Sequence, residues 1–363
     1  FLRKWLFSRN SPRRIGRYGN KMIKHSSEDF ARPPFTVNVS RGDMVESRHQ
    51  VIAAISDSEG KLVKSWGQVD SPVYLRSAIK PLQALPLIES GAADALDITE
   101  QELSLACASH TGEPIHVEAV TAWLNRIGLD ITDLECGSHW PTYDPAARAL
   151  AASGREPTAA HNNCSGKHTG FLSTALHLKE PLKGYIRRDH PVQKRIVTVL
   201  EDFTDLDLSD APVGIDGCSI PTIGIPLQNA AMAFARFADP SKMSQDRALA
   251  CQRLQQAIAK HPKMIAGSDR LCTALDGAAN GKIIAKVGAE AVYLAALPEV
   301  GIGIAIKALD GTTRAAETAL GAILEDLGVL NEEIHQAIDS YVHPVLRNRN
   351  DMAVGDIRVV LEN

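Results

Sequence analysis

Apolar runs of strand length stand near both ends of the chain. Residues 51–55 and 61–66 are rich in Val, Ile, Leu and Trp, and the polar segment between them ends in glycine. Two β-favouring runs around such a turn are typical of a hairpin. Towards the carboxyl end, residues 301–309 alternate weakly between apolar and other positions, and residues 357–361 are rich in Ile, Val and Leu. We expect strands in both.

The middle of the chain is patterned mainly for helices. Apolar residues recur there at helical spacing, which predicts helices over 77–90, 100–108, 114–127, 169–178, 191–204, 246–260 and 314–327, and a strand over 213–221. Pro86 should kink or shorten the first of these helices. Strands at both ends with helices between them favour an α/β fold. We therefore predict a single domain over residues 36–363, in which N- and C-terminal strands close a mainly antiparallel sheet flanked by helices.

The composition is that of a globular protein with an acidic body and a basic head. The chain has 363 residues, 44% of them hydrophobic, and a net charge of −4. Residues 1–24 carry eight Lys or Arg and no acidic residue, which leaves about −12 on the rest. An acidic body argues against nucleic acid as the main partner. Residues 1–35 are interpreted as a basic, disordered arm, with an organelle-targeting peptide as the alternative.

Neither a membrane segment nor a disulfide framework is expected. No run of 18 or more apolar residues occurs, so nothing is predicted to span a membrane. Six cysteines in a chain of this length without a secretion signal are interpreted as reduced thiols. Together these features favour a cytoplasmic location.

One serine stands a helical turn before a lysine. Ser77 is three residues ahead of Lys80, at the expected start of a helix. Residues three apart share a helix face, so Lys80 can reach the hydroxyl. A partly desolvated lysine with a lowered pKa can act as the base that a serine nucleophile needs. Ser58 and Lys61 have the same spacing in the expected hairpin turn, so the spacing alone does not identify a catalytic pair.

A second polar group combines thiols with an amine. Cys164 stands three residues before Lys167, and Cys218 lies in a separate Asp-Gly-Cys segment. Thiolates bind Zn²⁺ well, whereas a lysine can donate to a metal only when it is neutral. By themselves these residues leave two interpretations open, a metal site and ordinary packed thiols.

Taken singly, Ser109 and Lys286 also have ordinary interpretations, as a helix cap and a strand-edge lysine. Taken in order along the chain, the polar motifs resemble those of one family. They are Arg41-Gly42-Asp43-Met44-Val45-Glu46-Ser47-Arg48-His49, Arg76-Ser77-x-x-Lys80-Pro81, Cys107-Ala108-Ser109-His110, Cys136-Gly137-x-His139, Asn163-Cys164-Ser165-Gly166-Lys167-His168, Asp216-Gly217-Cys218 and Lys286-x-Gly288-Ala289-Glu290. Over roughly residues 36–363 the chain resembles the rhizobial-type L-asparaginases, the asparaginase II family.

The resemblance implies a fold similar to that of serine β-lactamases and glutaminases, a homodimer, and hydrolysis of L-asparagine to aspartate and ammonia. It implies a nucleophile with its base and a second serine–lysine pair in the same pocket, namely Ser77 with Lys80, and Ser109 with Lys286. The residues that it implies for substrate binding are Arg76, His168, Asp216 and Cys272. It also implies one zinc ion per chain that supports substrate binding and is held by water, Cys164, Lys167 and Cys218.

Three other functions remain open on the sequence. A β-lactamase or penicillin-binding protein shares Ser-x-x-Lys but also needs Ser-Asp-Asn and Lys-Thr-Gly elements, and neither occurs here. A glutaminase substrate differs by one methylene, which a hydrophobic pocket discriminates by only about 1–3 kcal/mol. The non-enzymatic alternative is a zinc-stabilised binding protein with structural serine–lysine pairs. Ammonia release from asparagine separates it from an enzyme.

Overall fold

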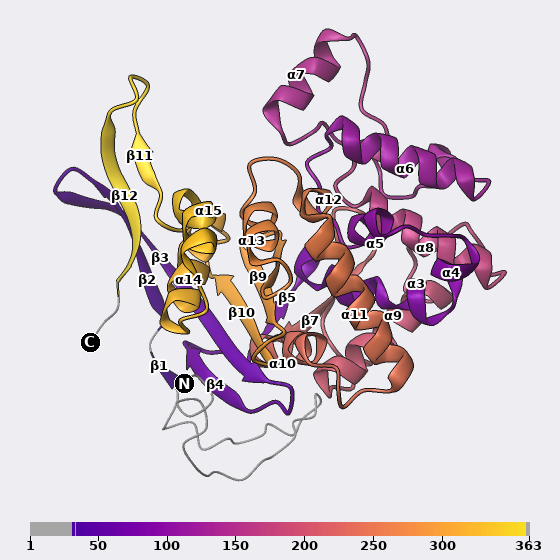
Figure 1. The fold of residues 1–363 in the computed structure, drawn as a ribbon, viewed down its shortest axis with the longest axis horizontal. Coiled ribbons are helices and arrows are strands. Elements are labelled where there is room, and N and C mark those ends of the chain that lie inside the picture. The colour runs from indigo at the N-terminus through magenta and orange to yellow at the C-terminus, as the bar shows by residue number, and fades with distance from the viewer. Residues whose placement is uncertain (1–30, 33, 361–363) are drawn as a thin grey trace.

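One nine-stranded sheet joins the two ends of the chain in the computed structural model, which describes residues 31, 32 and 34–360 (Figure 1). Seven strands follow the order β11-β12-β2-β3-β10-β9-β8, while β4 pairs with β3 and β1 pairs with β4 off this path. Within the described ranges every pairing in this sheet is antiparallel except that of β1 with β4. The strands are β1 (Ala31–Arg32), β2 (Phe35–Arg41), β3 (Met44–Asp57), β4 (Leu62–Trp66), β8 (Ile284–Gly288), β9 (Val292–Leu297), β10 (Ile302–Ala308), β11 (Val345–Arg347) and β12 (Ala353–Val360).

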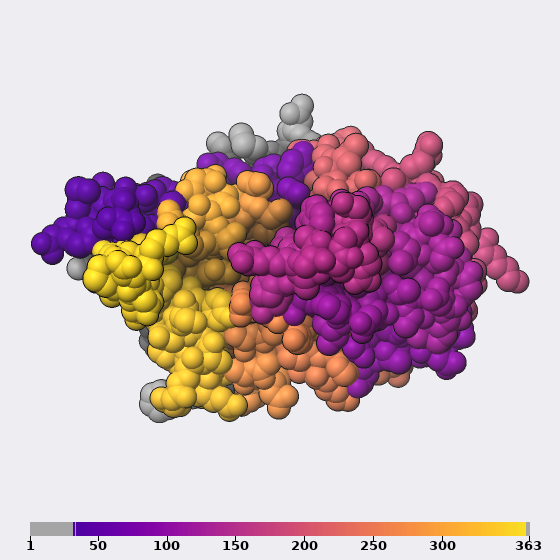
Figure 2. All heavy atoms as spheres, turned by 90° about the horizontal axis from the view of Figure 1, so that it is seen from above, coloured from indigo at the N-terminus to yellow at the C-terminus, as the bar shows by residue number. Residues whose placement is uncertain are grey.

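Strands from the two ends of the chain lie side by side. In the antiparallel pairing of β12 with β2, Ile357 stands opposite Val39. Figure 2 shows the yellow C-terminal segment against the indigo N-terminal strands. This arrangement confirms the predicted α/β fold, with a mainly antiparallel sheet closed by strands from both ends and flanked by helices.

Helices cover both faces of the central strands. Residues 51–56 of β3 are all buried, which explains why the sequence there is a continuous apolar run rather than an alternating one. Helices α10 (Leu227–Ala238) and α14 (Thr313–Asp326) both pack on these strands. A Cβ atom on Gly303 would lie 2.0 Å from the carbonyl oxygen of Ala231, so α10 lies directly on β10 at this glycine.

Most of the other helices form a second half of the molecule beside the sheet (Figure 1). They are η2 (Arg76–Ile79), α2 (Lys80–Gln83), α3 (Leu85–Glu89), α4 (Ala92–Ala95), α5 (Glu100–Ala106), α6 (Pro114–Arg126), η3 (Ile131–Asp133), α7 (Asp144–Ala152), η4 (Ala159–His161), α8 (Ser165–His177), α9 (Pro191–Thr204), α11 (Gln245–Lys260) and α12 (Pro262–Ala266). Helix α13 (Leu271–Ala279) packs on β8 and on α15 (Glu332–Val342), and α15 also packs on α14. A three-stranded sheet has the order β5 (Pro72–Tyr74), β7 (Pro221–Pro226) and β6 (Val213–Ile215).

Most predicted elements are confirmed, but one helix start and one strand were wrong. The strand predicted over 213–221 ends at Ile215 as β6, because hydrogen bonds within residues 216–220 close a turn before β7 begins at Pro221. The hairpin forms as β3 and β4, and the helix predicted over 77–90 is broken at Ala84, next to Pro86. Helix α8 begins at Ser165 rather than at 169. A Cβ atom on Gly166, in the first turn of this helix, would lie 2.3 Å from the carbonyl oxygen of Leu105. The glycine therefore permits close contact between α8 and α5 inside a helix.

A single hydrophobic cluster runs through both halves of the molecule. All six cysteines are unpaired and buried, as predicted. Among the described residues no helix is long and apolar enough to cross a membrane. The basic arm was assigned to residues 1–35. Residues 1–30 lie outside the described ranges, whereas Ala31 and Arg32 pair with β4 as β1.

The contact between α10 and β10 predicts a large stability cost for Gly303→Ala. The added Cβ atom would meet backbone atoms that cannot move independently, and we expect a loss of about 1–3 kcal/mol. The matched control is Gly277→Ala on the exposed side of α13, where the nearest atom is 3.5 Å away. Helix propensity should make this change neutral or stabilising by up to about 1 kcal/mol. Urea unfolding measures both variants, and equal midpoints would contradict the predicted close contact.

Candidate active site

Two buried lysines converge on the hydroxyl of Ser109. Lys80 Nζ lies 3.0 Å from Ser109 Oγ, and Lys286 Nζ lies 2.9 Å from the same atom. Lys80, at the start of α2, also donates to the carbonyl oxygen of Ala108, and Lys286, in β8, donates to that of Val287 at 2.9 Å. Ser109 follows α5, and its N–H donates to Ile265 at 2.9 Å. The structure thus joins Lys80, Ser109 and Lys286 in one hydrogen-bonded row.

The charge state of Lys286 gives this row its chemistry. Complete burial, together with the nearby charge of Lys80, lowers the pKa of Lys286 from 10.5 to about 7. A substantial fraction of Lys286 is therefore a neutral amine near neutral pH. Its lone pair can accept the proton of the Ser109 hydroxyl, while the ammonium of Lys80 donates to the hydroxyl oxygen. The row can pass a proton in either direction.

Ser77 lies one 3₁₀ turn before Lys80, but its hydroxyl makes no hydrogen bond with the Lys80 amine. The N–H of Lys80 donates to the carbonyl oxygen of Ser77, which closes a 3₁₀ turn. In such a turn the side chains at positions i and i+3 eclipse each other. Ser77 is half-buried, and across the described residues its hydroxyl has no hydrogen-bond partner. The lysine that the sequence paired with Ser77 contacts Ser109, while the Ser77 hydroxyl stays available.

A glycine lets β8 lie against this turn. A Cβ atom on Gly288 would lie 2.6 Å from the carbonyl oxygen of Leu75 and 3.0 Å from the nitrogen of Ala78. Lys286 stands two residues earlier in β8, and alternate residues of a strand face the same side. The spacing of Lys286 and Gly288 therefore brings the amine to the side of β8 that meets η2.

An ion pair ties the same turn to the segment that carries Cys218. Arg76 Nη2 lies 2.7 Å and Nε lies 2.9 Å from Asp216 Oδ1. Burial raises the pKa of the Asp216 carboxyl, but the hydrogen bond from Arg76 and the charge of Lys167 outweigh it and lower the pKa. Arg76 has a left-handed backbone with φ of 50°, which is uncommon for a residue with a side chain. A cleft lined by both members of this pair opens beside η2.

Cys164, Lys167 and Cys218 lie close together in the structure. Cys164 directly precedes α8, Lys167 lies in the first turn of that helix, and Lys167 Nζ is 3.1 Å from Cys218 Sγ. A hydrogen bond from Cys218 holds the pKa of the Cys164 thiol well below its usual value against the effect of burial, with further help from Lys80 and Lys167. Lys80, a member of the serine row, therefore also interacts with the thiol group.

The donor set of this group fits a zinc ion. Two sulfur atoms and one amine meet in a buried position, which matches the preference of Zn²⁺ for thiolate and nitrogen ligands. Burial lowers the pKa of Lys167, but Cys218 and Cys164 outweigh it and raise the pKa. Without a metal, the ammonium hydrogen-bonds to sulfur. A metal in its place would require loss of that proton.

The two remaining residues of the predicted substrate site contact other protein groups. His168 is completely buried, and its Nδ1 lies 2.8 Å from the hydroxyl of Tyr185. The Nε2 atom of His168 has no partner among the described residues. Cys272 in α13 is also buried, 4.0 Å from the hydroxyl of Tyr293, and burial raises the pKa of its thiol to about 11.

Sequence reasoning missed two buried carboxyl groups near the row. Glu113 accepts hydrogen bonds from the Thr111 hydroxyl at 2.8 Å and from the N–H and hydroxyl of Ser268 at 2.7 and 2.8 Å. Asp276 accepts from the N–H of Ala285, next to Lys286, and burial raises the pKa of this carboxyl well above its usual value. Asp276 could have been noticed, because it is the only charged residue in the largely apolar segment 271–279, which forms α13.

The lowered pKa of Lys286 predicts a stability gain at alkaline pH. Between about 7 and 10.5 the unfolded lysine holds a proton that the folded one lacks, so the free energy of unfolding rises with pH. Relative to Lys286→Met, the wild type should gain about 2 kcal/mol between pH 7 and pH 9. Urea unfolding at several pH values measures this, with Lys282→Met as a surface control. Parallel curves for wild type and Lys286→Met would show that Lys286 keeps an ordinary pKa.

Comparisons with known proteins returned solved structures and one family. Similar solved structures include "Crystal Structure Analysis of Mglu" (16% identity, 77% of this chain, 67% of that chain, TM-score 0.34). A second is a candidate beta-lactamase from Bacteroides dorei DSM 17855, with 13% identity over 78% of this chain and 86% of that chain and a TM-score of 0.37. A third is the LovD6 mutant of simvastatin synthase from Aspergillus terreus, with 11% identity over 70% of this chain and 86% of that chain and a TM-score of 0.35. No curated protein matches. The L-asparaginase II family matches residues 37–359, and the chain belongs to that family.

Proposed function

We propose that the protein hydrolyses the side-chain amide of L-asparagine to L-aspartate and ammonia through a serine acyl-enzyme. The observation that carries the proposal is the buried row of Lys80, Ser109 and Lys286, in which the pKa of Lys286 is lowered to about 7. A base that is neutral near pH 7 is what an amide hydrolase with a serine nucleophile requires. Membership of the L-asparaginase II family supports the choice of substrate.

The nucleophile in this mechanism is Ser77. Lys80 first passes a proton through Ser109 to the neutral amine of Lys286, and Lys80 then takes the hydroxyl proton of Ser77 as Oγ attacks the amide carbon. Backbone N–H groups at the start of η2 hold the oxyanion. The C–N bond then breaks as Ser109 donates a proton to the leaving ammonia and regains one from the lysines on either side. Water hydrolyses the aspartyl ester on Ser77, which releases aspartate and restores the hydroxyl.

Two charged side chains suit the rest of the substrate. Arg76 directly precedes Ser77, and its guanidinium is paired with the carboxylate of Asp216. Both side chains are partly exposed. They offer opposite charges to the α-carboxylate and α-ammonium of an amino acid. His168 and Cys272 are assigned to the same substrate site, with the unpartnered Nε2 of His168 as a hydrogen-bonding atom.

Cys164, Lys167 and Cys218 would hold one Zn²⁺, with a water molecule as the fourth ligand. Such an ion supplies a positive charge that supports substrate binding. The chain itself contributes the lowered pKa of Cys164, caused first by its hydrogen bond with Cys218, the position of Lys167 on the same helical turn, and the link through Lys80 to the serine row. A homodimer, as expected of the family, and a cytoplasmic location, which the reduced cysteines favour, complete the proposal.

A second candidate nucleophile is Ser109. It is favoured by one observation, since both lysines contact its hydroxyl and neither contacts that of Ser77. Glutamine is the closest alternative substrate, because one methylene changes binding in a hydrophobic pocket by only about 1–3 kcal/mol. A zinc-stabilised binding protein is the non-enzymatic alternative, and it would release no ammonia.

The proposal predicts that Ser77→Ala abolishes ammonia release from asparagine while leaving the fold unchanged. Its hydroxyl makes no hydrogen bond in the described part of the chain, so its removal should not destabilise the protein. Ser58→Ala is the matched control, because Ser58 has the same spacing to a lysine in the β3–β4 turn, and full activity is expected. Circular dichroism checks the fold. If Ser77→Ala keeps more than a few per cent of wild-type activity, Ser77 is not the nucleophile and Ser109 becomes the favoured candidate.

The zinc assignment predicts about one equivalent of zinc in protein purified without chelator. Stripping the ion should mainly raise KM, since loss of ground-state binding has that signature. Cys218→Ser should lose most of the zinc, whereas Cys251→Ala, which removes a buried thiol in α11, should keep it. Elemental analysis and steady-state kinetics measure these effects. Full zinc content in a Cys164→Ser/Cys218→Ser double variant would exclude the site, and a collapse of kcat alone would exclude the binding role.

A further inference from the structure

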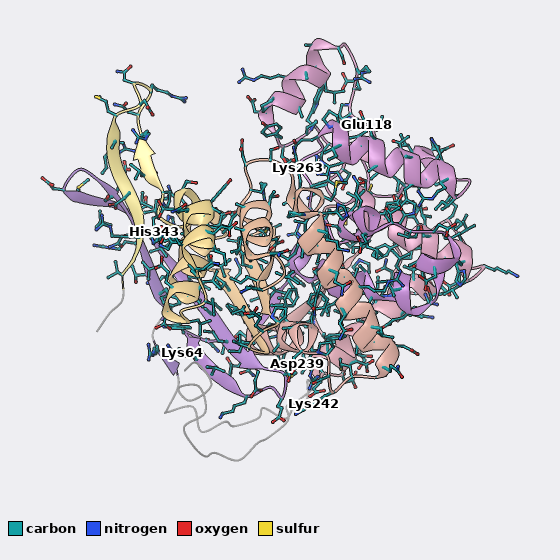
Figure 3. The ribbon with its side chains drawn as sticks, viewed as in Figure 1. Lys64, Glu118, Asp239, Lys242, Lys263 and His343 are labelled. Carbon is teal, nitrogen blue, oxygen red and sulfur yellow. The ribbon has the colours of Figure 1, made fainter. Side chains whose placement is uncertain are left out.

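A second group of metal-ligating side chains lies on α14 and α15, outside the candidate active site. Glu325 belongs to the last turn of α14, His335 to α15, and His343 directly follows α15. Their ligand atoms all lie within 4.8 Å of one another. Figure 3 shows His343 in the C-terminal part of the molecule, well apart from Lys263 near Glu113. We propose that Glu325, His335 and His343 bind one divalent transition-metal ion of the zinc class.

The distances match those of a small tetrahedral ion. The Nε2 atoms of His335 and His343 lie 3.3 and 3.4 Å from the same carboxylate oxygen, Glu325 Oε1. Two ligands bound at 2.0–2.1 Å to a tetrahedral ion are about 3.4 Å apart. Both nitrogens thus already stand at ligand spacing from the oxygen. Two imidazoles and one carboxylate suit Zn²⁺, Co²⁺ or Ni²⁺ rather than Mg²⁺ or Ca²⁺.

A further carboxylate orients one of the imidazoles. Asp339 Oδ1 lies 3.0 Å from His343 Nδ1. When Nδ1–H donates to this carboxylate, Nε2 presents its lone pair towards Glu325, as in many metal sites in which a carboxylate fixes the histidine tautomer. Among the described residues no Lys or Arg forms an ion pair with Glu325, so no such side chain competes with a metal ion for this carboxylate.

Helix packing fixes the positions of two of the ligands, Glu325 and His343. A Cβ atom on Gly321 would lie 2.4 Å from the Cβ atom of Val342, so α14 and the end of α15 touch at this glycine. Glu325 stands four residues after Gly321, on the same helix face, and His343 follows Val342. Both helices also end here, and the negative end of a helix dipole favours a cation.

Cobalt titration of the full chain tests this site separately from the thiol group. After chelator treatment, the wild type should bind one more equivalent of Co²⁺ than the Glu325→Gln/His335→Gln/His343→Gln variant. The extra ion should give d–d absorption without a thiolate-to-metal charge-transfer band, and any such band from the cysteines should be equal in both proteins. Asp339→Asn should lower the affinity for the extra Co²⁺ ion about 10–100-fold. His177→Gln, which lies outside the group, should leave both the affinity and the number of bound Co²⁺ ions unchanged.

Thermal unfolding supplies a second readout. Zn²⁺ should raise the melting temperature of the wild type more than that of the triple variant, because an ion bound only to the folded state stabilises it. Without metal the two melting temperatures should agree, since the three side chains are substantially exposed, and the rate of asparagine hydrolysis should also agree. Equal cobalt equivalents in wild type and triple variant, or extra cobalt with only thiolate bands, would overturn the proposal.

Discussion

The placement of two buried ammonium groups around one hydroxyl is the constraint on which the rest of the site depends. Lys80 and Lys286 both reach Ser109 Oγ, and two like charges at such separation in a protein interior repel strongly. The protein reduces the repulsion in two ways. The carbonyl oxygens of Ala108 and Val287 and the thiol of Cys164 compensate positive charge, and Lys286 gives up its proton near neutral pH. Burial lowers the pKa of Lys286 most, and the nearby charge of Lys80 lowers it further, so the packing that makes two ammonium ions unfavourable also creates a neutral amine.

Four segments that are distant in sequence must meet for this to happen. They are the η2–α2 turn, the loop after α5, strand β8 and the start of α8. Glycines stand where two pairs of these segments touch, because Gly288 lets β8 approach η2 and Gly166 lets α8 approach α5. Close backbone contact at these two positions leaves little freedom for the lysine and cysteine side chains between them. The geometry of the row thus follows from main-chain packing as much as from the polar residues themselves.

The sequence predicted the fold better than it predicted the contacts within the site. Periodicity sufficed for the hairpin and for α9, because β3 and α9 each bury a continuous set of apolar residues. The closing C-terminal strand could be predicted from its Ile and Val content, although only Ile357 in it is buried. Periodicity failed at the start of α8, where Gly166 serves packing and not a turn. The pairing of Lys80 with Ser109 could not be read from spacing, because the two residues are joined only by the tertiary fold. Local spacing likewise could not separate Ser77 and Lys80 from Ser58 and Lys61, which differ in the 3₁₀ turn that aligns the first pair.

The central claim is that the lysine row serves covalent chemistry at Ser77. The most direct measurement is to inactivate the wild-type enzyme with a diazoketone analogue of asparagine, whose electrophilic carbon stands where the amide carbon would be, and to locate the label by peptide mass spectrometry. The account predicts one label per chain on Ser77, and protection by asparagine. A label on Ser109, or complete inactivation without any label on a serine, would contradict it.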